Sequence, residues 1–184
     1  HFWLDLAYDK ENGTWGEKML KDDTGKLYAQ YGSLWWSYAE LDQVAATLNL
    51  SHDPEKKDYT DKLTRTAKHW LDGFVDKEYK EVYFSIKRDG SKGWDWKVDD
   101  TMKCFLWKNG FHSAEHALVM YIHGQALEKK PVELFFAVPA GQEKTFVAVP
   151  YVFKGKVKGR QVGRKLTVDN KELVKVKVFF SAIR

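Results

Sequence analysis

The sequence contains one cysteine, Cys104, and four prolines in 184 residues. A single cysteine excludes a disulfide within the chain and is typical of proteins from a reducing compartment. No apolar run approaches the roughly 20 residues that a membrane-spanning helix requires. The first residues also lack the pattern of a signal peptide. We therefore expect a cytoplasmic protein that has no membrane partner.

Two regions differ in composition, although 43% apolar and 15% aromatic residues are typical of a chain that folds throughout. Residues 131–184 contain eleven Lys and Arg against four Asp and Glu, or +7. Residues 1–130 contain nineteen against twenty-two, or −3, and hold all eight tryptophans. We therefore predict two domains, 1–130 and 131–184.

An internal repeat organises the first region. The pattern Trp-Leu-Asp-x-x-x-Asp-Lys-Glu occurs at residues 3–11 and, 67 positions later, at residues 70–78. Asp-Gly or Thr-Gly turns follow each copy and favour β-hairpins, because glycine accepts a positive φ. Each repeat thus predicts a helix end, a hairpin and a next helix. Because the first copy begins the chain, we expect the helix before Trp3 to be missing.

Apolar spacing predicts the helices. One spans 34–49 with Ser33 as its N-cap, a second begins at Asp53-Pro54-Glu55 and ends near Asp76, and a third covers about 113–127.

The basic region is predicted to be a small antiparallel β domain. Its β-branched and aromatic runs lie at 132–138, 145–152, 157–164 and 172–183. The last run alternates lysine with valine, which predicts one solvated face and one buried face.

Aromatic and polar residues gather at two predicted helix starts. They are Trp35, Trp36 and Glu40 in one cluster, and Trp107, His112, Glu115 and His116 in the other. Tryptophan faces stack on sugar rings, while carboxylates and imidazoles bind hydroxyls and exchange protons. These clusters predict a sugar site. The other histidines, such as His69, have no assigned role.

The first region resembles the N-acylglucosamine 2-epimerase family, which includes cellobiose 2-epimerases and mannose-type isomerases. The resemblance rests on Trp-Trp-x-x-Ala-Glu, Trp-x-x-x-Phe-Val-Asp, an Asp-Gly hairpin and Trp-Lys-x-x-aromatic-His, and it covers most of residues 1–127. It implies the C-terminal portion of an (α/α)6 barrel built of helical hairpins. The chain is thus expected to be mainly α with a β appendage. Its partners would be the missing N-terminal half of the barrel and a sugar, and the isolated chain is expected to be inactive.

The resemblance also implies roles for the site residues. His112 would be the general acid/base at C2 of a free reducing sugar, acting through an enediolate without metal or organic cofactor. Trp107 and either Trp35 or Trp36 would stack the sugar. Glu40, with Glu115 or His116, would orient or polarise it.

The chain departs from the family pattern in two places. Residues 113–116 read Ser-Ala-Glu-His where the family has Asn and Arg nearby, and the second family histidine, on a His-x-x-Glu helix, has no counterpart. The identity of the sugar and the choice between epimerase and isomerase therefore remain open.

Two alternative functions fit parts of the sequence. His112-Ser113-Ala114-Glu115-His116 matches H-x-x-E-H, in which two histidines bind zinc and the glutamate activates water. The +7 region alternatively predicts a non-catalytic module that binds carbohydrate or a polyanion. Lysines that alternate along a strand more often form a solvated face, so nucleic acid is not the expected partner.

Overall fold

The computed structural model describes residues 1–31, 33–51, 57–88, 90–93, 102–104 and 107–184. They form two compact units. The first unit comprises residues 1–49 and 53–120, and the C-terminal unit comprises residues 50–52 and 121–184. Each unit is described below by itself.

The chain has a mixed α/β fold, and the expectation of a mainly α protein was wrong. Among the described residues, four helices account for 33% and several small antiparallel sheets account for 32%. The described residues show neither an (α/α)6 barrel nor a six-hairpin array. Most of the strand content lies in the region expected as a β appendage, where two strands contain 13 and 11 residues, while the longest strand of the first region contains 8.

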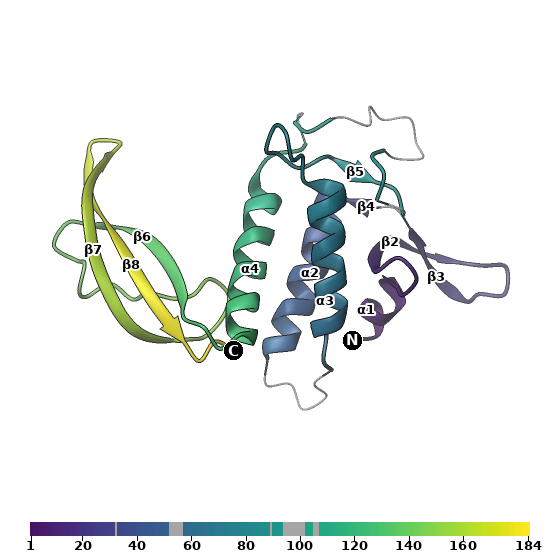
Figure 1. Cartoon of the computed structure of the whole chain (residues 1–184), viewed down its shortest axis with the longest axis horizontal. Coiled ribbons are helices and arrows are strands. Elements are labelled where there is room, and N and C mark those ends of the chain that lie inside the picture. Colours follow the sequence, from purple (N-terminus) through teal and green to yellow (C-terminus); the bar gives the residue numbers. More distant parts are fainter. Residues whose placement is uncertain (32, 52–56, 89, 94–101, 105–106) are drawn as a thin grey trace. The chain divides into compact units, whose positions relative to one another are not determined.

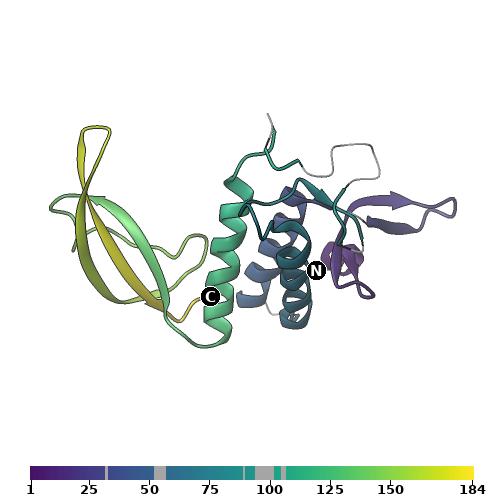
Figure 2. The ribbon, with the colours of Figure 1, turned by 45° about the horizontal axis from the view of Figure 1, so that its top comes forward.

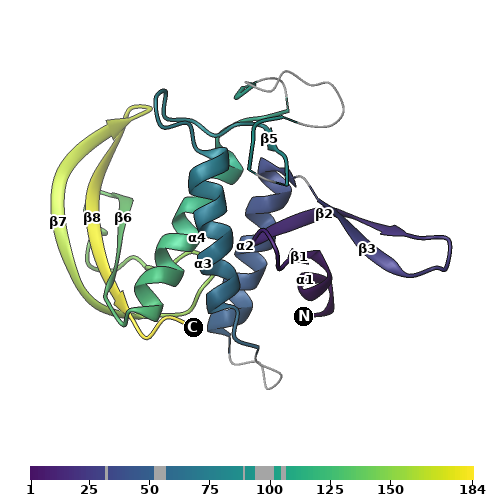
Figure 3. The same cartoon turned by 45° about the vertical axis from the view of Figure 1, so that its right-hand side comes forward.

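The N-terminal part of the first unit is a short helix followed by a three-stranded sheet. Its elements are α1 (Phe2–Ala7), β1 (Tyr8–Asp9), β2 (Thr14–Lys21) and β3 (Leu27–Tyr31), and the strand order is β1-β2-β3. In three views the β2–β3 hairpin extends away from the helices of this unit (Figures 1, 2 and 3). A two-stranded sheet joins β4 (Ser33–Leu34) to β5 (Ser85–Ile86).

The remaining helices pack beside one another in the first unit (Figures 1 and 3). They are α2 (Trp35–Leu50), α3 (Thr60–His69), which continues as the π-helical turn η1 (Trp70–Phe74), and α4 (Phe111–Leu127), whose second half belongs to the C-terminal unit. The helices predicted at 34–49 and 113–127 are therefore confirmed to within two residues. The predicted start at Asp53-Pro54-Glu55 lies outside the described residues. Ser33 is not an N-cap, because it lies in β4 and its hydroxyl donates to the Trp15 carbonyl at 2.7 Å.

The two copies of the repeat have the same local structure. Each helix end passes into extended backbone, at Tyr8 and at Val75, and an aspartate follows. Asp9 Oδ1 accepts the backbone N–H groups two and three residues ahead, at 3.0 and 3.5 Å, and Asp76 Oδ1 does the same at 2.8 and 3.1 Å. An antiparallel hairpin contact follows each copy. The repeated aspartate therefore builds the turn that connects each helix to its hairpin.

The C-terminal unit contains a three-stranded antiparallel sheet of order β6-β8-β7. Its strands are β6 (Val132–Pro139), β7 (Lys156–Val168) and β8 (Lys171–Ser181). Asp169 and Asn170 connect β7 to β8 with φ values of 48° and 59°, as in a type I′ turn. The predicted division of β8 into two faces is confirmed, because its valines and Phe180 are at most 3% exposed while the alternating lysines retain solvent contact.

The strand predicted at 145–152 is absent. Thr145 and Phe146 instead donate their backbone N–H groups to the Gln142 carbonyl, which forms a turn. The Arg160 guanidinium then bonds the Phe146 carbonyl at 2.9 Å. These bonds replace a ladder to a neighbouring strand, although Phe146 still packs on Phe136 with ring centroids 5.4 Å apart.

Candidate functional site

An aromatic hollow of about 410 Å³ lies where α2 and α4 begin. We call this cavity the aromatic hollow. The residues that line it are Leu34, Trp35, Trp36, Phe84, Trp107 and His112. The structure thus brings together both predicted clusters, which are about 70 residues apart in the chain. The β4–β5 pair positions this lining, because Leu34 is the last residue of β4 and Phe84 immediately precedes β5. The Trp35 backbone N–H also donates to the Phe84 carbonyl at 3.0 Å.

The three tryptophans of the hollow differ in exposure. Trp36 is 41% exposed and Trp107 is 78% exposed, so both present ring faces to solvent. Trp35 is only 3% exposed and forms the wall between Phe84 and the edge of His112. Its buried indole N–H has no hydrogen-bond partner among the residues that the structure describes. The structure therefore favours Trp36 over Trp35 as a stacking surface.

A buried lysine, Lys108, lies over the Trp35 ring. Lys108 is 1% exposed and its Nζ lies 5.3 Å from the centre of the Trp35 ring. Burial lowers the Lys108 pKa, while the Glu81 carboxylate 3.4 Å away acts in the opposite direction. The ammonium and its hydrocarbon chain thus hold the Trp35 ring in place.

His112 meets a carboxylate at the edge of the hollow. Its Nδ1 lies 2.9 Å from Glu40 Oε1, and the ring contacts Trp36 at a centroid distance of 6.2 Å. The His112 side chain is 29% exposed and that of Glu40 is 44% exposed, so solutes reach both. Glu115, one turn along α4, is the third member of this cluster, and one ligand atom from each residue lies within 4.8 Å of the others.

His116 lies in the core, although the sequence placed it with the catalytic candidates. It is 3% exposed, packs on Trp70 at a centroid distance of 4.2 Å, and its Nε2 lies 2.7 Å from Asp42 Oδ2. Asp42 is fully buried and also accepts the Trp15 indole N–H at 2.8 Å and the Thr66 hydroxyl at 2.6 Å.

The two histidines of the H-x-x-E-H motif therefore bind different acids. They are four residues apart, about 6 Å along α4, and His116 contacts the buried Asp42. His112 pairs with Glu40 instead. The peptidase motif requires both imidazoles at a single metal position. This arrangement does not place them there.

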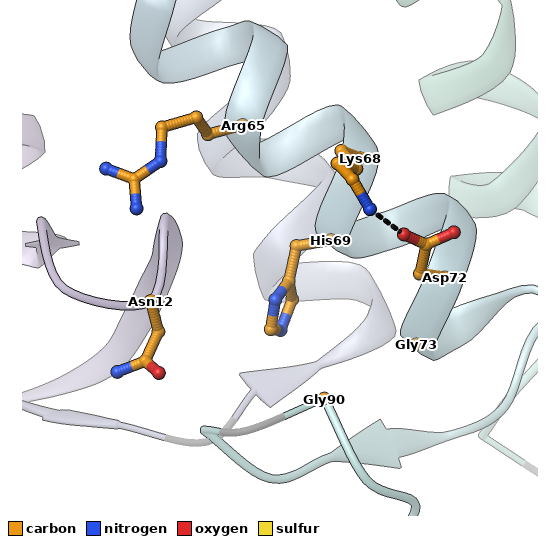
Figure 4. Close-up of a pocket in the computed structure, with 7 residues that line it drawn as sticks. All are labelled: Asn12, Arg65, Lys68, His69, Asp72, Gly73 and Gly90. Atoms are coloured by element: carbon orange, nitrogen blue, oxygen red, sulfur yellow. Dashed lines mark hydrogen bonds and ion pairs between the residues drawn. The ribbon is translucent and has the colours of Figure 1, made fainter.

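A second hollow, of about 430 Å³, lies beside the C-terminal half of α3. Arg65, His69 and Asn12 point into the same space, and Gly90 lies below them (Figure 4). The Arg65 guanidinium already donates to the carbonyls of residues 10 and 11 at 2.7 and 3.1 Å. The Lys68 ammonium is paired with Asp72 (Figure 4). The charged side chains that line this second hollow are thus largely paired, and its lining among the described residues contains no tryptophan, tyrosine or phenylalanine.

Comparison with known proteins found no matching family model, no matching curated protein and no matching solved structure. Among the described residues, no helix is both long enough and apolar enough to cross a membrane.

Sequence reasoning missed one part of this arrangement. Asp42, the acceptor that holds His116, had no recognisable signal, because an aspartate inside a helix is usually exposed.

Proposed function

We propose that the aromatic hollow binds a free reducing sugar and that His112 transfers a proton at its C2. The observation that carries this proposal is the His112–Glu40 pair, 2.9 Å apart, at the edge of a hollow that has two exposed tryptophan faces. Neither of the other functions considered from the sequence uses this combination.

Binding would depend mainly on the tryptophans. The hollow, about 410 Å³, falls within the range of small-molecule sites. Trp36 and Trp107 offer apolar faces for a sugar ring. His112, which lines the hollow, and Glu40, which bonds it, supply polar groups at its edge.

The chemistry follows from the histidine–carboxylate pair. When the Nδ1–H of His112 donates to Glu40, the carboxylate fixes the tautomer and leaves Nε2 as the base. In the open-chain sugar the C2 proton lies next to the carbonyl. Its transfer to Nε2 forms an enediolate. Return of that proton to the same face of C2 gives the starting sugar, and its delivery to the opposite face, after the enediolate turns over, gives the epimer. Return to C1, together with transfer of the C2 hydroxyl proton to O1, gives a ketose. The resemblance to the N-acylglucosamine 2-epimerase family supports this assignment.

Deuterium exchange tests the proposal. The expectation of an inactive chain rested on half of a barrel, which the described residues do not show. The purified chain itself, incubated with aldohexoses and their reducing disaccharides in D₂O, should therefore introduce deuterium at C2, detected by NMR. His112→Ala should remove the exchange while circular dichroism remains unchanged. Exchange that persists in His112→Ala, or that never exceeds the rate in buffer, would contradict the proposal.

Sugar binding provides a second readout with a matched control. Trp107→Ala should weaken binding about tenfold, which corresponds to 1.4 kcal/mol and is typical of an aromatic contact. Trp3→Ala should leave the affinity unchanged, because Trp3 is similarly exposed, at 58%, but lies in α1 and not in the hollow. Equal effects of the two substitutions would exclude the hollow as the binding site.

A further inference from the structure

Three metal-binding side chains converge at the edge of the aromatic hollow. His112 and Glu115 lie three residues apart in the first turns of α4, and this spacing places them on one face of the helix. Glu40 reaches them from α2. One donor atom from each of the three lies within 4.8 Å of the others, and all three residues are partly buried.

The donor set suits a divalent transition metal. An imidazole nitrogen and two carboxylate oxygens are ligands of Zn²⁺ and similar ions, at about 2.0–2.2 Å from the metal. Donors that already lie within 4.8 Å of one another need only small side-chain movements to reach a common ion. Two carboxylates also balance the charge of a dication, which lowers the cost of placing the ion in a partly buried site.

We propose that Glu40, His112 and Glu115 bind one divalent transition-metal ion. The arrangement differs from that of the inverted zinc-peptidase motif, in which both histidines are ligands and the glutamate is the base. Here His116 is bound to Asp42, 2.7 Å away in the core, and Glu115 takes a place in the ligand set. Three protein ligands leave coordination positions for water or for an oxygen of a ligand in the hollow.

The metal site shares His112 with the proposed sugar site but does not rest on the proposed function. A metal ion that binds His112 and Glu40 displaces the hydrogen bond between them and removes the base from proton transfer. Zn²⁺ is therefore expected to inhibit C2 exchange, and exchange itself is to be measured in the presence of a chelator.

The test is a titration of the purified chain with Zn²⁺ in the absence of sugar, in competition with a chromophoric chelator. We expect one ion per chain. Glu40→Gln and Glu115→Gln should each weaken binding at least about tenfold, and His112→Ala should weaken it further. Glu128→Gln should change nothing, because Glu128 is exposed just beyond the end of α4. Melting curves in chelator confirm that each variant folds.

Glu115→Gln separates the metal proposal from its alternatives. If Glu115 were only a base, this substitution would leave zinc affinity unchanged, and that result would overturn the proposal. Unchanged affinity in Glu40→Gln, or no stoichiometric zinc binding by the wild-type chain, would also overturn it. Metal binding without C2 exchange in chelator would contradict the proposed function alone, and exchange without metal binding would contradict the metal site alone.

Discussion

Removal of the Asp42 carboxylate should destabilise the protein strongly, because this group accepts hydrogen bonds from three elements. In Asp42→Ala the buried Trp15 N–H and His116 Nε2 lose their acceptor. Thr66 retains a contact to the Leu63 carbonyl at 3.3 Å, so two groups are left unsatisfied. At about 1–3 kcal/mol each, the expected loss is about 2–6 kcal/mol. A typical domain has only about 5–15 kcal/mol of stability in total.

Two further aspartate variants, one at Asp42 itself and one at an exposed position, serve as comparisons for this prediction. Asp42→Asn keeps one acceptor oxygen and should lose less, about 1–2 kcal/mol. Asp23→Ala removes an exposed carboxylate from a turn and should lie within about 0.5 kcal/mol of wild type. Urea unfolding followed by circular dichroism measures all three, and the NMR signal of the Trp15 indole N–H reports its environment. An Asp42→Ala loss below about 1 kcal/mol would refute the network as a stabilising element.

Two other predictions concern stability. The Asp76 carboxylate contacts Lys103 at 2.6 Å and accepts from the Tyr79 N–H and the Tyr83 hydroxyl, and these partners hold its pKa well below the ordinary value of 3.8. The stability that the ionised carboxylate gives the fold is therefore complete above that value and is lost as the pH falls below it. The melting-temperature difference between wild type and Asp76→Asn should therefore shrink from neutral pH to about pH 2.5, and a constant difference would contradict this cause. In the C-terminal unit, Phe180→Ala should cost about 3–5 kcal/mol in urea unfolding because the side chain is fully buried. Phe135→Ala on the solvated face, where the residue is 57% exposed, should cost less than about 1 kcal/mol, and similar losses would mean that the two faces are not distinct.

Several features of the fold could be predicted because they depend on short-range patterns. The helix beginning at Trp35 follows from apolar spacing, and the two faces of β8 follow from alternating lysine and valine. The Asp169-Asn170 turn follows from the ease with which these residues adopt positive φ. The repeat also identified matching turns, since Asp9 and Asp76 bond their own downstream backbone.

The predicted barrel was wrong because the resemblance describes local segments, whereas a barrel depends on how many helical pairs assemble. The β2–β3 hairpin and the long strands β7 and β8 gave the chain nearly equal helix and strand content. The strand predicted at 145–152 failed for a related reason. A strand needs a partner edge, and in its place the Arg160 guanidinium bonds the Phe146 carbonyl.

The sequence by itself identified the residues that could bind a ligand or transfer a proton, which are tryptophans, carboxylates and two histidines near predicted helix starts. Tertiary structure alone decided their neighbours. Packing of α2 against α4 paired His112 with Glu40 at a hollow, and it directed His116, only four residues further on, to the buried Asp42. The physical reason is that a contact between residues 72 or 74 positions apart depends on helix orientation and burial, which local patterns do not encode.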